Sequence, residues 1–424
     1  MKIYIFEDEG YKNFLPLTYF RPVYDLRCGA LSLKEKIEKY LKNKVTGLHT
    51  RKELTGVTKE SYPKKDINNF PTDYSLFING RIIADKNFFK EIKFEKSIDQ
   101  LFISGDTIVA AYLTPQTLES MKKYWLGNPF PLFQVSNFKN IPIHNIDARV
   151  ANYPWDLITF NGDEIGNDFY LLAKEMKGKT ILGKIHKGVH LLNRQNIIMD
   201  RESEIHPGVV LDASNGPIII GANVLIMANS VITGPVYIGD DSIIKIGAKI
   251  YSNTSIGDSC KVGGEVDSTI IQSHSNKQHD GYLGHAYVGS WVNIGADTNN
   301  SDLKNNYSPI KVTINGKLIN TGLIHFGTIL GDHSKTGINM MFDTGSVVGV
   351  FCNLYSAGLP PRYIPSFTRG SGSGPLKTNS FEMSIDTAKI VMARRNVQLT
   401  KEYEELVKIV FDDTQTERKQ TGIL

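Results

Sequence analysis

Three histidines, His274, His279 and His285, lie close together in the chain. His279 stands between Lys277 and Asp280 where a regular sequence repeat is interrupted, so we expect it in a surface cleft rather than in an apolar core. An unperturbed imidazole titrates near ~6.5, which suits a base that deprotonates an ammonium group at neutral pH. Backbone N–H groups at nearby tight turns would stabilise a developing oxyanion. The predicted chemistry is acyl transfer from a thioester to an amine, without a covalent enzyme intermediate.

The interrupted repeat has a period of six residues. An aliphatic residue recurs at every sixth position, at Ile220, Ile226, Ile232, Ile238, Ile244, Ile250, Ile256 and Val262. A small residue or valine stands four positions after each of them, and glycine follows directly at positions 221, 239, 257 and 263. A period of six does not match a helix, but it is typical of a triangular coil whose sides are short parallel strands. We therefore predict a left-handed parallel β-helix over residues 179–368.

Two interruptions of the repeat are expected to carry function. After a slip near Ser268, the pattern is predicted to resume at Ile270, Tyr282, Val288 and Ile294, and the histidines fall within this irregular stretch. The second interruption is the polar segment 299–323, which is long enough to project from the coil as an arm. Long loops without a pattern of their own are usually functional or disordered. We expect this arm to cover a neighbouring subunit.

The segments on either side of the coil have other patterns. Residues 1–178 alternate apolar runs with helical patterns, which predicts a mixed α/β domain, and Ser32 and Glu35 form a capping box at the start of one helix. Residues 369–375 are rich in glycine and serine, which predicts a flexible linker. The remainder of 369–424 contains two amphipathic patterns, expected as helices that pack over an end or a side of the coil.

Composition excludes several classes of function. The chain has 424 residues with 48 basic and 44 acidic side chains and a formal net charge of +4, which disfavours a dedicated nucleic-acid or membrane-surface protein. The first residues turn acidic after a short apolar run, and no long apolar run follows, so neither secretion nor membrane spanning is predicted. The three cysteines are far apart and odd in number, which favours a reducing cytoplasm.

The run from His279 to Thr298, HDGYLGHAYVGSWVNIGADT, resembles the HxxYxGDxxxGxxVNIGAGT stretch of the bifunctional N-acetylglucosamine-1-phosphate uridylyltransferase and glucosamine-1-phosphate acetyltransferase family. The segments SNKQHDGYLGH, NNSDLKNNY, GDHSKTGINMMFDTG and the C-terminal MARR resemble the alternate form of that enzyme from Bacteroidetes-type bacteria. The resemblance covers most of the chain. It implies a Rossmann-like nucleotidyltransferase domain before the coil, acetyl-CoA and UTP as co-substrates, Mg²⁺ for nucleotidyl transfer, and a homotrimer.

The resemblance also implies roles for individual residues. His279 matches the general base, Tyr282 and Asn293 match contacts to the amino sugar, and Ala296 matches a backbone contact to acetyl-CoA. Further matches are Lys245 and Lys304, as contacts to the sugar phosphate, and Arg362, as a contact to coenzyme A or a partner in a salt bridge. Lys245 replaces an arginine of the family and loses its bidentate fork. Asp297 replaces a glycine and His285 an aspartate, and both changes could alter substrate choice.

The N-terminal domain departs further from the family. The usual glycine loop is absent, and Arg21, Arg27 and Lys34 are the implied phosphate ligands. Alternatively, Arg21 and Arg27 pair structurally with Asp8 and Asp25. The usual metal-binding carboxylate has Arg81 as its nearest counterpart, which opposes nucleotidyl transfer, and Asp156 is the candidate magnesium ligand, although Asp163 is not excluded.

Together these observations predict a transferase that makes UDP-N-acetylglucosamine for cell-wall precursors. Two alternatives concern the N-terminal domain: it binds a sugar nucleotide without catalysis, or it uses another nucleotide, such as dTTP with glucose-1-phosphate. A third uses the histidines as zinc ligands, as γ-class carbonic anhydrases do on a similar coil with histidines from two subunits. The histidine spacing, the long arm and the N-terminal domain argue against it.

Overall fold

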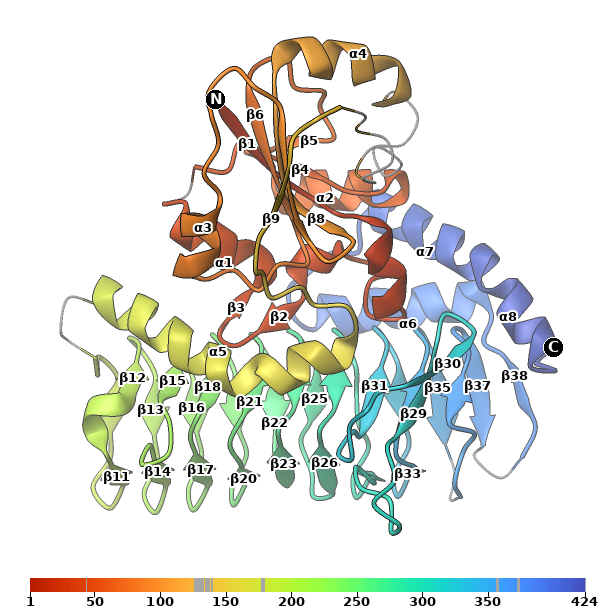
Figure 1. Ribbon diagram of the computed structural model, residues 1–424. Helices are drawn as coiled ribbons and strands as arrows, with labels where there is room; N and C mark the ends of the chain where they lie inside the picture. Colours follow the sequence, from red (N-terminus) through yellow and green to blue (C-terminus); the bar gives the residue numbers. More distant parts are fainter. Residues whose placement is uncertain are drawn as a thin grey trace. The chain divides into compact units, whose positions relative to one another are not determined.

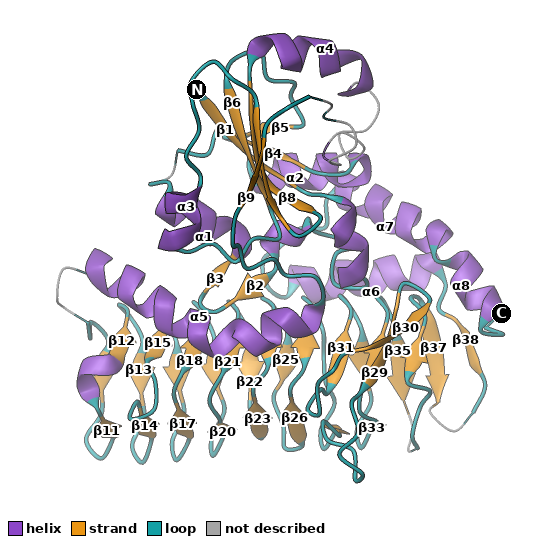
Figure 2. Ribbon diagram, viewed as in Figure 1, coloured by secondary structure: helices purple, strands orange, loops and turns teal. Residues whose placement is uncertain are grey.

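The computed structural model describes residues 1–42, 44–125, 133, 138, 140–176, 180–355, 358–371 and 374–423. These residues divide into two compact units (Figures 1 and 2). The first contains residues 1–14, 20–26 and 31–153, and the second contains residues 15–19, 27–30 and 154–424. The domain limits expected from the sequence, at residues 178 and 368, stay predictions.

The first unit is built around one mixed sheet with the strand order β5-β4-β1-β6-β8-β7-β9. Its strands are β1 (Lys2–Phe6), β4 (Gly47–His49), β5 (Asp66–Ile67), β6 (Ser75–Asn79), β7 (Gln100–Ser104), β8 (Thr107–Leu113) and β9 (Ile143–Asn145). The first four strands in this order are parallel, and β8 runs antiparallel to both of its neighbours. Apolar side chains form two buried clusters, one containing Ile5 and Ile78 and the other containing Tyr4 and Phe77. Because successive side chains of a strand point to opposite faces, both faces of this sheet are covered.

The helices of the first unit are α1 (Leu33–Tyr40), α2 (Thr55–Ser61), α3 (Lys86–Glu91) and α4 (Pro115–Trp125), and the short strand β3 (Leu31–Ser32) precedes α1. The predicted capping box at α1 is confirmed: the Ser32 hydroxyl accepts from the Glu35 amide at 3.2 Å, and the Glu35 carboxylate accepts from the Ser32 amide at 2.7 Å. Two backbone N–H groups at the start of the helix thus find side-chain acceptors only three residues away. This is why the start of the helix could be predicted from the sequence.

The second unit is a coil of three parallel sheets whose rungs follow one another along its length (Figure 1). The first sheet contains β10 (Lys184–Ile185), β13 (Glu204–Ile205), β16 (Leu225–Ile226), β19 (Ile243–Ile244), β22 (Lys261–Val262) and β25 (Asn276–Lys277). The second contains β11 (His190–Leu192), β14 (Val210–Asp212), β17 (Val231–Thr233), β20 (Lys249–Ile250), β23 (Glu265–Asp267) and β26 (Tyr282–Gly284). The third contains β12 (Ile197–Met199), β15 (Ile218–Ile220), β18 (Val236–Ile238), β21 (Thr254–Ile256), β24 (Ile270–Ile271), β27 (Tyr287–Val288), β31 (Thr328–Leu330), β34 (Ser346–Val348) and β36 (Tyr363–Ile364).

The coil confirms the predicted left-handed parallel β-helix. All eight aliphatic residues of the period-six pattern are at most 1% exposed and belong to a single core cluster, which runs along the inside of the coil. Equivalent positions stack directly, as Ile220 pairs with Ile238 and Ile238 with Ile256. Each rung therefore buries its large side chain against the same position of its neighbours.

The predicted phase after the slip is wrong by one residue at Ile270 and Tyr282, whereas Val288 and Ile294 belong to the core cluster as predicted. Ile256 pairs with Ile271 and Val266 with Leu283, so Ile271 and Leu283, rather than Ile270 and Tyr282, continue the core cluster. The register changes because the corners between β22 and β23 and between β23 and β24 are shorter than the corresponding ones of the preceding rung. Since neighbouring residues of a strand face opposite ways, this shift turns the side chain of Tyr282 away from the coil interior.

The polar segment 299–323 differs from the freely projecting arm that its composition suggested. It contains β28 (Asn299–Asn300), which pairs with β33 (Met341–Phe342), and a hairpin of β29 (Lys311–Ile314) and β30 (Lys317–Asn320). Ile310, Val312 and Ile314 are at most 1% exposed, and β29 packs against β34 of the same chain. The alternating apolar residues of this short strand give the segment a face that covers its own coil.

The expected linker at 369–375 is also different. Its first part lies in β37 (Thr368–Ser371), which pairs with β35 (Asn353–Tyr355) and with β38 (Leu376–Thr378) in a sheet that begins at β32 (Lys335–Thr336). Gly370 adopts a φ of 148°, a conformation that glycine tolerates without strain. The glycines thus serve an edge hairpin rather than a flexible connection; residues 372 and 373 lie outside the described residues.

Helices accompany the coil on two sides. The two predicted C-terminal helices are α6 (Phe381–Ala393) and α7 (Lys401–Asp413), followed by the short α8 (Gln415–Gln420). The long helix α5 (Pro154–Glu175) also belongs to this unit and contacts β15, β18, β21 and β27. The side-chain oxygen of Asn161 in α5 accepts hydrogen bonds from the Gly29 amide at 2.7 Å and the Ser255 hydroxyl at 3.0 Å. Strand β2 (Arg27–Cys28) joins the same unit.

Candidate functional sites

His279 lies on the corner of the coil between β25 and β26, and its side chain is exposed. The corner is held from inside by Lys277, whose ammonium group donates to the carbonyl oxygens of His279 at 2.8 Å and Gly263 at 3.0 Å. Burial lowers the pKa of Lys277 to about 8. The candidate base is thus carried on a turn whose backbone is fixed by an internal lysine.

Tyr282 and His285 share one carboxylate. The Tyr282 hydroxyl donates to the Asp302 carboxylate at 2.9 Å, and Nδ1 of His285 lies 2.7 Å from the same oxygen. Burial raises the pKa of Tyr282, and the charge of Asp302 raises it further. Burial opposes ionisation of Asp302, yet hydrogen bonds from His285 and Tyr282 hold the pKa of Asp302 below its ordinary value. Asp302, in the polar segment after the coil rung, was missed by sequence reasoning.

The three histidines of the irregular stretch do not converge within one chain. They follow β24, β25 and β26 in turn and therefore occupy three successive corners of the coil. A different set, His285, Asp302 and His325, brings its potential ligand atoms within 4.8 Å of one another, and the His285 and His325 rings stack at 5.1 Å. The zinc alternative therefore does not find its three predicted ligands together in this chain.

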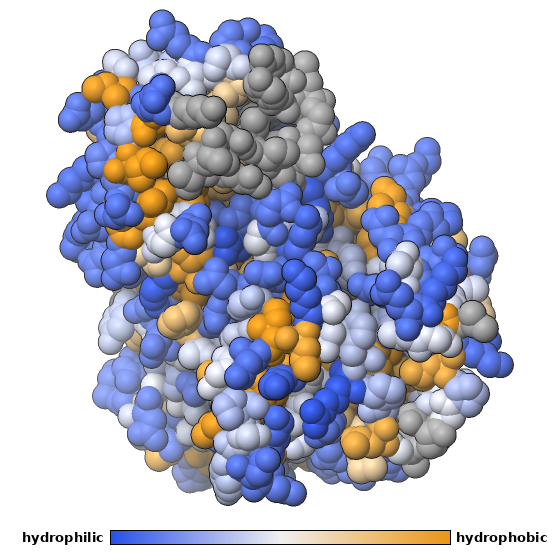
Figure 3. All heavy atoms as spheres, turned by 45° about the vertical axis from the view of Figure 1, so that its right-hand side comes forward, coloured by the Kyte–Doolittle hydropathy of each residue, from blue (hydrophilic) through white to orange (hydrophobic). Residues whose placement is uncertain are grey.

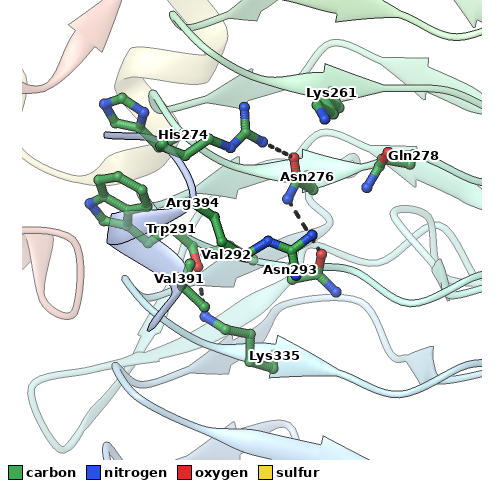
Figure 4. Close-up of a pocket in the computed structure, with 11 residues that line it drawn as sticks. Lys261, His274, Asn276, Gln278, Trp291, Val292, Asn293, Lys335, Val391 and Arg394 are labelled. Carbon is green, nitrogen blue, oxygen red and sulfur yellow. Dashed lines mark hydrogen bonds between the residues drawn. The ribbon is translucent and has the colours of Figure 1, made fainter. Parts of the chain in front are cut away.

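A cavity of about 560 Å³ lies on the outer face of the sheet that contains β22 and β25 (Figure 4). Its lining includes Asn293, a predicted sugar contact, and Gln278, the chain neighbour of His279. The side-chain amide of Asn276 donates to the side-chain oxygen of Asn293 at 3.5 Å, a long hydrogen bond. Asn293 joins neighbouring rungs through bridges to Asn276 and Lys335. The remaining lining residues are Lys261, His274, Trp291, Val292, Val391, Arg394 and Arg395.

The other predicted residues of the coil have these positions. Lys245 is half-buried on the rung before β22, and Ala296 lies at a turn where its carbonyl accepts from the Asn339 amide at 2.8 Å. The ammonium group of Lys304 donates to the Pro309 carbonyl at 2.9 Å, within the polar segment. The guanidinium of Arg362 contacts Asp343 at 2.5 and 2.7 Å. Of the two roles that the sequence allowed for Arg362, the structure contains the salt bridge.

The predicted phosphate ligands do not fall in one unit. Arg21 and Lys34 belong to the first unit, whereas Arg27 and the candidate metal ligand Asp156 belong to the second. Lys34 pairs with Glu38 at 2.9 Å, with its ammonium over the Tyr62 ring, and Arg27 lies over the Tyr237 ring, 3.9 Å from Asp258. Both side chains thus have contacts within the protein, and their role as phosphate ligands stays a prediction.

The predicted alternative pairings are only partly seen. Burial raises the pKa of Asp25 to about 6, while the charge of Arg21 acts in the opposite direction, so these two groups do interact electrostatically. Asp8, however, pairs with Arg81 rather than with either predicted arginine. Two nitrogens of Arg81 contact the two Asp8 oxygens at 2.7 and 2.6 Å.

This Asp8–Arg81 pair borders a cavity of about 320 Å³ at the carboxyl ends of β1 and β6. Asn79 donates to Asp8 at 2.8 Å and the Gly10 amide at 3.1 Å, so with the two Arg81 nitrogens the carboxylate accepts four hydrogen bonds. The cavity is also lined by Gly10, Asp106 and Phe133, where a side chain at position 10 would collide with Arg81. Ligands of open α/β sheets bind at such strand ends. The adjacency of β1 and β6, which the sequence did not reveal, brings these residues together.

Comparisons with known proteins agree with this two-part architecture. Residues 3–177 match the family model described as sugar nucleotidyl transferase, and residues 217–245 match that of bacterial transferase hexapeptide (six repeats). The chain therefore combines a sugar nucleotidyltransferase domain with a hexapeptide-repeat coil, and the resemblance to the bifunctional uridylyltransferase and acetyltransferase family is confirmed.

Curated relatives carry corresponding names. A bifunctional protein GlmU from Synechococcus elongatus is 28% identical over 44% of this chain and 41% of that protein, so the chain matches less than half of that relative's length. A bifunctional protein GlmU from Methanococcus maripaludis is 25% identical over 79% of this chain and 88% of that protein. A bifunctional sugar-1-phosphate nucleotidylyltransferase/acetyltransferase from Sulfurisphaera tokodaii is 31% identical over 23% of this chain and 24% of that protein.

Among solved structures, a UDP-N-acetylglucosamine O-acyltransferase (LpxA) from Moraxella catarrhalis covers 55% of this chain and 93% of its own, at 16% identity and a TM-score of 0.22. This score is too low to define the fold, which rests on the strand pairing above. Among the described residues, none of the helices combines the length and apolar character that crossing a bilayer requires.

Proposed function

We propose that this chain is a bifunctional transferase. Its coil transfers the acetyl group of acetyl-CoA to the amine of glucosamine-1-phosphate, and its first domain transfers a uridylyl group from UTP to the resulting N-acetylglucosamine-1-phosphate. The observation that carries the proposal is His279, an exposed residue on a fixed corner, whose chain neighbour Gln278 lines the cavity that contains Asn293. Support comes from relatives that are named as bifunctional enzymes.

The acetyl transfer needs one base and no covalent intermediate. His279 takes a proton from the substrate ammonium, and the free amine attacks the thioester carbonyl. A carbon–nitrogen bond forms, the carbon–sulfur bond breaks as the tetrahedral intermediate collapses, and the departing thiolate takes up the second proton, which the attacking nitrogen releases. Backbone amides at the coil corners are suited to stabilise the oxyanion. Tyr282 and Asn293 would orient the amino sugar, with Ala296 next to the acetyl group and Lys245 and Lys304 towards the phosphate.

In the first domain, the cavity at the ends of β1 and β6 is the candidate nucleotide site. Among its described lining residues, the Asp8 carboxylate is paired with Arg81 and that of Glu9 with Lys12, so Asp106 alone would not make a set of protein ligands for magnesium. We therefore derive no step through the metal, and Mg²⁺ would arrive with the nucleotide phosphates. The same ion pair favours the second candidate, a first domain that binds a sugar nucleotide without catalysis.

Two assays on the same protein test both halves. Thiol release from acetyl-CoA with glucosamine-1-phosphate, and pyrophosphate release from UTP with N-acetylglucosamine-1-phosphate and Mg²⁺, are measured for wild type and His279→Ala. Loss of a general base should slow thiol release by about 10²–10⁴-fold and leave pyrophosphate release unchanged. His190→Ala, an exposed histidine on β11 of the same coil, is the matched control and should retain both activities.

No thiol release from wild type would refute the acetyltransferase assignment. Thiol release without pyrophosphate release would assign the first domain to nucleotide binding alone, and pyrophosphate release from dTTP rather than UTP would assign it to the other nucleotide. A uracil and a thymine differ by one methyl group, which a pocket discriminates by only about 1–3 kcal/mol, so both nucleotides belong in the assay.

The assembly and the location are part of the proposal. Coils of this class place their sites between neighbouring subunits, so we propose a homotrimer, which light scattering would detect as three times the mass of the chain. A cytoplasmic location is consistent with three buried cysteines that form no disulfide among the described residues. We propose neither nucleic acid nor membrane as a partner.

A further inference from the structure

The cavity of about 560 Å³ on the coil has an unusual charge balance. Four cationic side chains line it: Lys261 and Lys335 from the coil, and Arg394 and Arg395 from the end of α6. Its described lining contains no aspartate or glutamate. Figure 4 shows Arg394 extending from the end of α6 toward Asn293. The cavity is therefore a positively charged pocket formed by two parts of the chain that are distant in sequence.

Two of these four side chains donate hydrogen bonds to neutral groups, and the other two have no such partner among the described residues. Arg395 donates to the Ser259 carbonyl at 3.0 Å and to the side-chain oxygen of Asn276 at 2.8 Å. Lys335 donates to the carbonyls of Trp291 and His333, both at 2.8 Å. Within the part of the chain that the structure describes, Lys261 and Arg394 have neither a hydrogen-bonded nor an ion-paired side-chain partner. The pocket thus fixes two cations in place and leaves two available.

The cations also act on one another. Burial lowers the pKa of Lys261, and the positive charges of Arg395 and Lys245 lower it further. Burial also lowers the pKa of His274 on the rim, again with a contribution from Arg395. Assembling like charges in this way costs free energy that a bound anion would recover.

We propose that this pocket binds the diphosphate group of a phosphorylated ligand, with Arg394 and Arg395 as forked donors and Lys261 as a point charge. A single phosphate carries about two negative charges and would leave part of the cationic set unmatched. Arginine presents a planar fork that matches phosphate oxygens in a bidentate way. The C-terminal helix α6 is then a ligand-binding element as well as a cover for the coil. As a coenzyme A site, this inference rests on the proposed function, because the same cavity contains Asn293; binding of pyrophosphate itself does not require the proposed reactions.

Two ligands of this chemistry fit the surroundings. One is coenzyme A, because Gln278 lines the pocket and precedes the candidate base His279. The other is a nucleoside diphosphate sugar, the chemical class of the product proposed above. Its binding would make the pocket a regulatory site for that product. Both ligands contain a diphosphate, so inorganic pyrophosphate can detect the site. Competition between pyrophosphate and each ligand then shows which of the two binds there.

The test is calorimetric titration of the full chain with inorganic pyrophosphate and, separately, with orthophosphate. Wild type should bind pyrophosphate at least about tenfold more tightly than orthophosphate. The double variant Lys261→Gln/Arg394→Gln should bind pyrophosphate at least about tenfold more weakly, since each charge-assisted contact is among the stronger hydrogen bonds in proteins. Lys389→Gln is the matched control, because this exposed lysine lies in α6, pairs with Glu404 at 3.1 Å and should leave binding unchanged.

Thermal unfolding of each variant shows whether it is folded, and Arg394→Gln alone, at an exposed position, serves if the double variant is not. Displacement of pyrophosphate by coenzyme A or by UDP-N-acetylglucosamine supports the proposal and identifies the source. Absence of pyrophosphate binding to wild type, equal binding to wild type and double variant, or equal affinity for orthophosphate would overturn it. Each of these readouts is independent of acetyl transfer, so it separates this inference from the proposed function.

Discussion

Internal lysines are a feature of this coil. Lys277 in β25 and Lys335 in β32, two strands that are joined through bridges to Asn293, direct their ammonium groups to backbone carbonyls. Each ammonium satisfies acceptors at a corner where the ladder of the sheet is interrupted. The cost of burial shows in the lowered pKa values, about 8 for Lys277 and about 7 for Lys335. Near His279, this arrangement makes the corner rigid without a side chain of opposite charge.

Lys277 is therefore expected to act as a positioning residue for His279. Lys277→Met leaves the His279 and Gly263 carbonyls without their donor, which should cost about 1–3 kcal/mol of unfolding free energy. A looser corner should lower kcat for thiol release while KM for acetyl-CoA changes little. Urea unfolding and steady-state kinetics measure the two effects.

Lys249→Met is the control for this variant. Lys249 is an exposed lysine 3.7 Å from Glu265, so its replacement should change stability by less than about 0.5 kcal/mol and leave kcat unchanged. If Lys277→Met loses stability while kcat stays at the wild-type value, Lys277 supports only the coil.

The three cysteines should be inert in the folded chain. Cys28, Cys260 and Cys352 are buried, and burial raises the pKa values of Cys260 and Cys352 to about 12. Since the thiolate is the reactive form, a disulfide reagent near neutral pH should react with none of them. Unfolding in guanidinium should release three equivalents. Reaction of one equivalent before unfolding would contradict this, and inert cysteines also keep the thiol-release assay free of background.

Among the elements, one row of corners of the coil combines a rare backbone conformation with stacked aromatic rings. His274, Trp291, His333, Phe351 and Phe367 all adopt φ values between 54° and 66°, a conformation that bulky residues rarely take. Their rings form a ladder with successive centroid separations of 4.2, 6.0, 4.4 and 5.1 Å. Helix α7 packs on this ladder, where the Tyr403 hydroxyl lies 3.0 Å from His333. Stacking offsets the backbone strain and gives the C-terminal helices a surface to cover.

In the first unit, strands β1 and β6 are tied at their carboxyl ends by Asp8 and Arg81. Arg81→Met removes one partner of a largely buried pair and should destabilise the first unit by about 3 kcal/mol, the lower end for such changes because Asp8 retains some exposure. Asp8→Asn/Arg81→Met should recover part of this loss, since no unpaired charge remains. Thermal and urea unfolding, followed by a probe in this unit, give the values.

The comparison for this pair is Arg149→Met, which breaks a more exposed contact with Asp85 at 3.6 Å and should cost less than about 1 kcal/mol. Equal losses of unfolding free energy in Arg81→Met and Arg149→Met would show that the Asp8–Arg81 pair stabilises the unit no more than an exposed pair does. Nucleotide binding by the same variants tests whether the bordering cavity depends on the pair.

Across the whole molecule, polar side chains cover most of the face shown in Figure 3, and the hydrophobic patches between them are separate. The formal net charge of +4 is small for a chain of 424 residues. The positive charge that matters is therefore local, as in the pocket beneath α6. Net charge alone would not have located it.

The stability of the whole molecule should depend on pH through Lys335. Burial of its ammonium group lowers its pKa to about 7 from an ordinary 10.5, while the charge of Asp332 acts in the opposite direction. Between these two values the unfolded chain binds more protons, so wild type gains stability relative to Lys335→Met as the pH rises, by at most about 1.4 kcal/mol per unit. Below about pH 7 the lysine is protonated in both states, and the difference should be constant.

Urea unfolding of both proteins at about pH 6, 7, 8 and 9 measures this dependence. The comparison with Lys335→Met cancels the titration of tyrosines and cysteines that the two proteins share. A difference in unfolding free energy that does not change from about pH 7 to 9 would mean that Lys335 remains charged in the fold.

Features that depend on neighbouring residues could be predicted from the chain alone. The period-six aliphatic residues define the coil because each rung repeats the same local pattern, and the capping box at Ser32 and Glu35 joins groups only three residues apart. The corner position of His279 follows from the same repeat. The irregular turn shifted the phase at Ile271 because a change in turn length leaves no periodic signal.

Features that depend on distant segments could not be predicted in this way. Arg27 packs on Tyr237 of the coil, and residues 369–371 lie in β37 because β35 and β38 offer backbone groups on both sides. Lys261 and Arg394 line one pocket although more than a hundred residues separate them. A local pattern specifies which face of an element is apolar, but long-range packing selects which elements meet, and the charge and shape of a pocket arise only where they do.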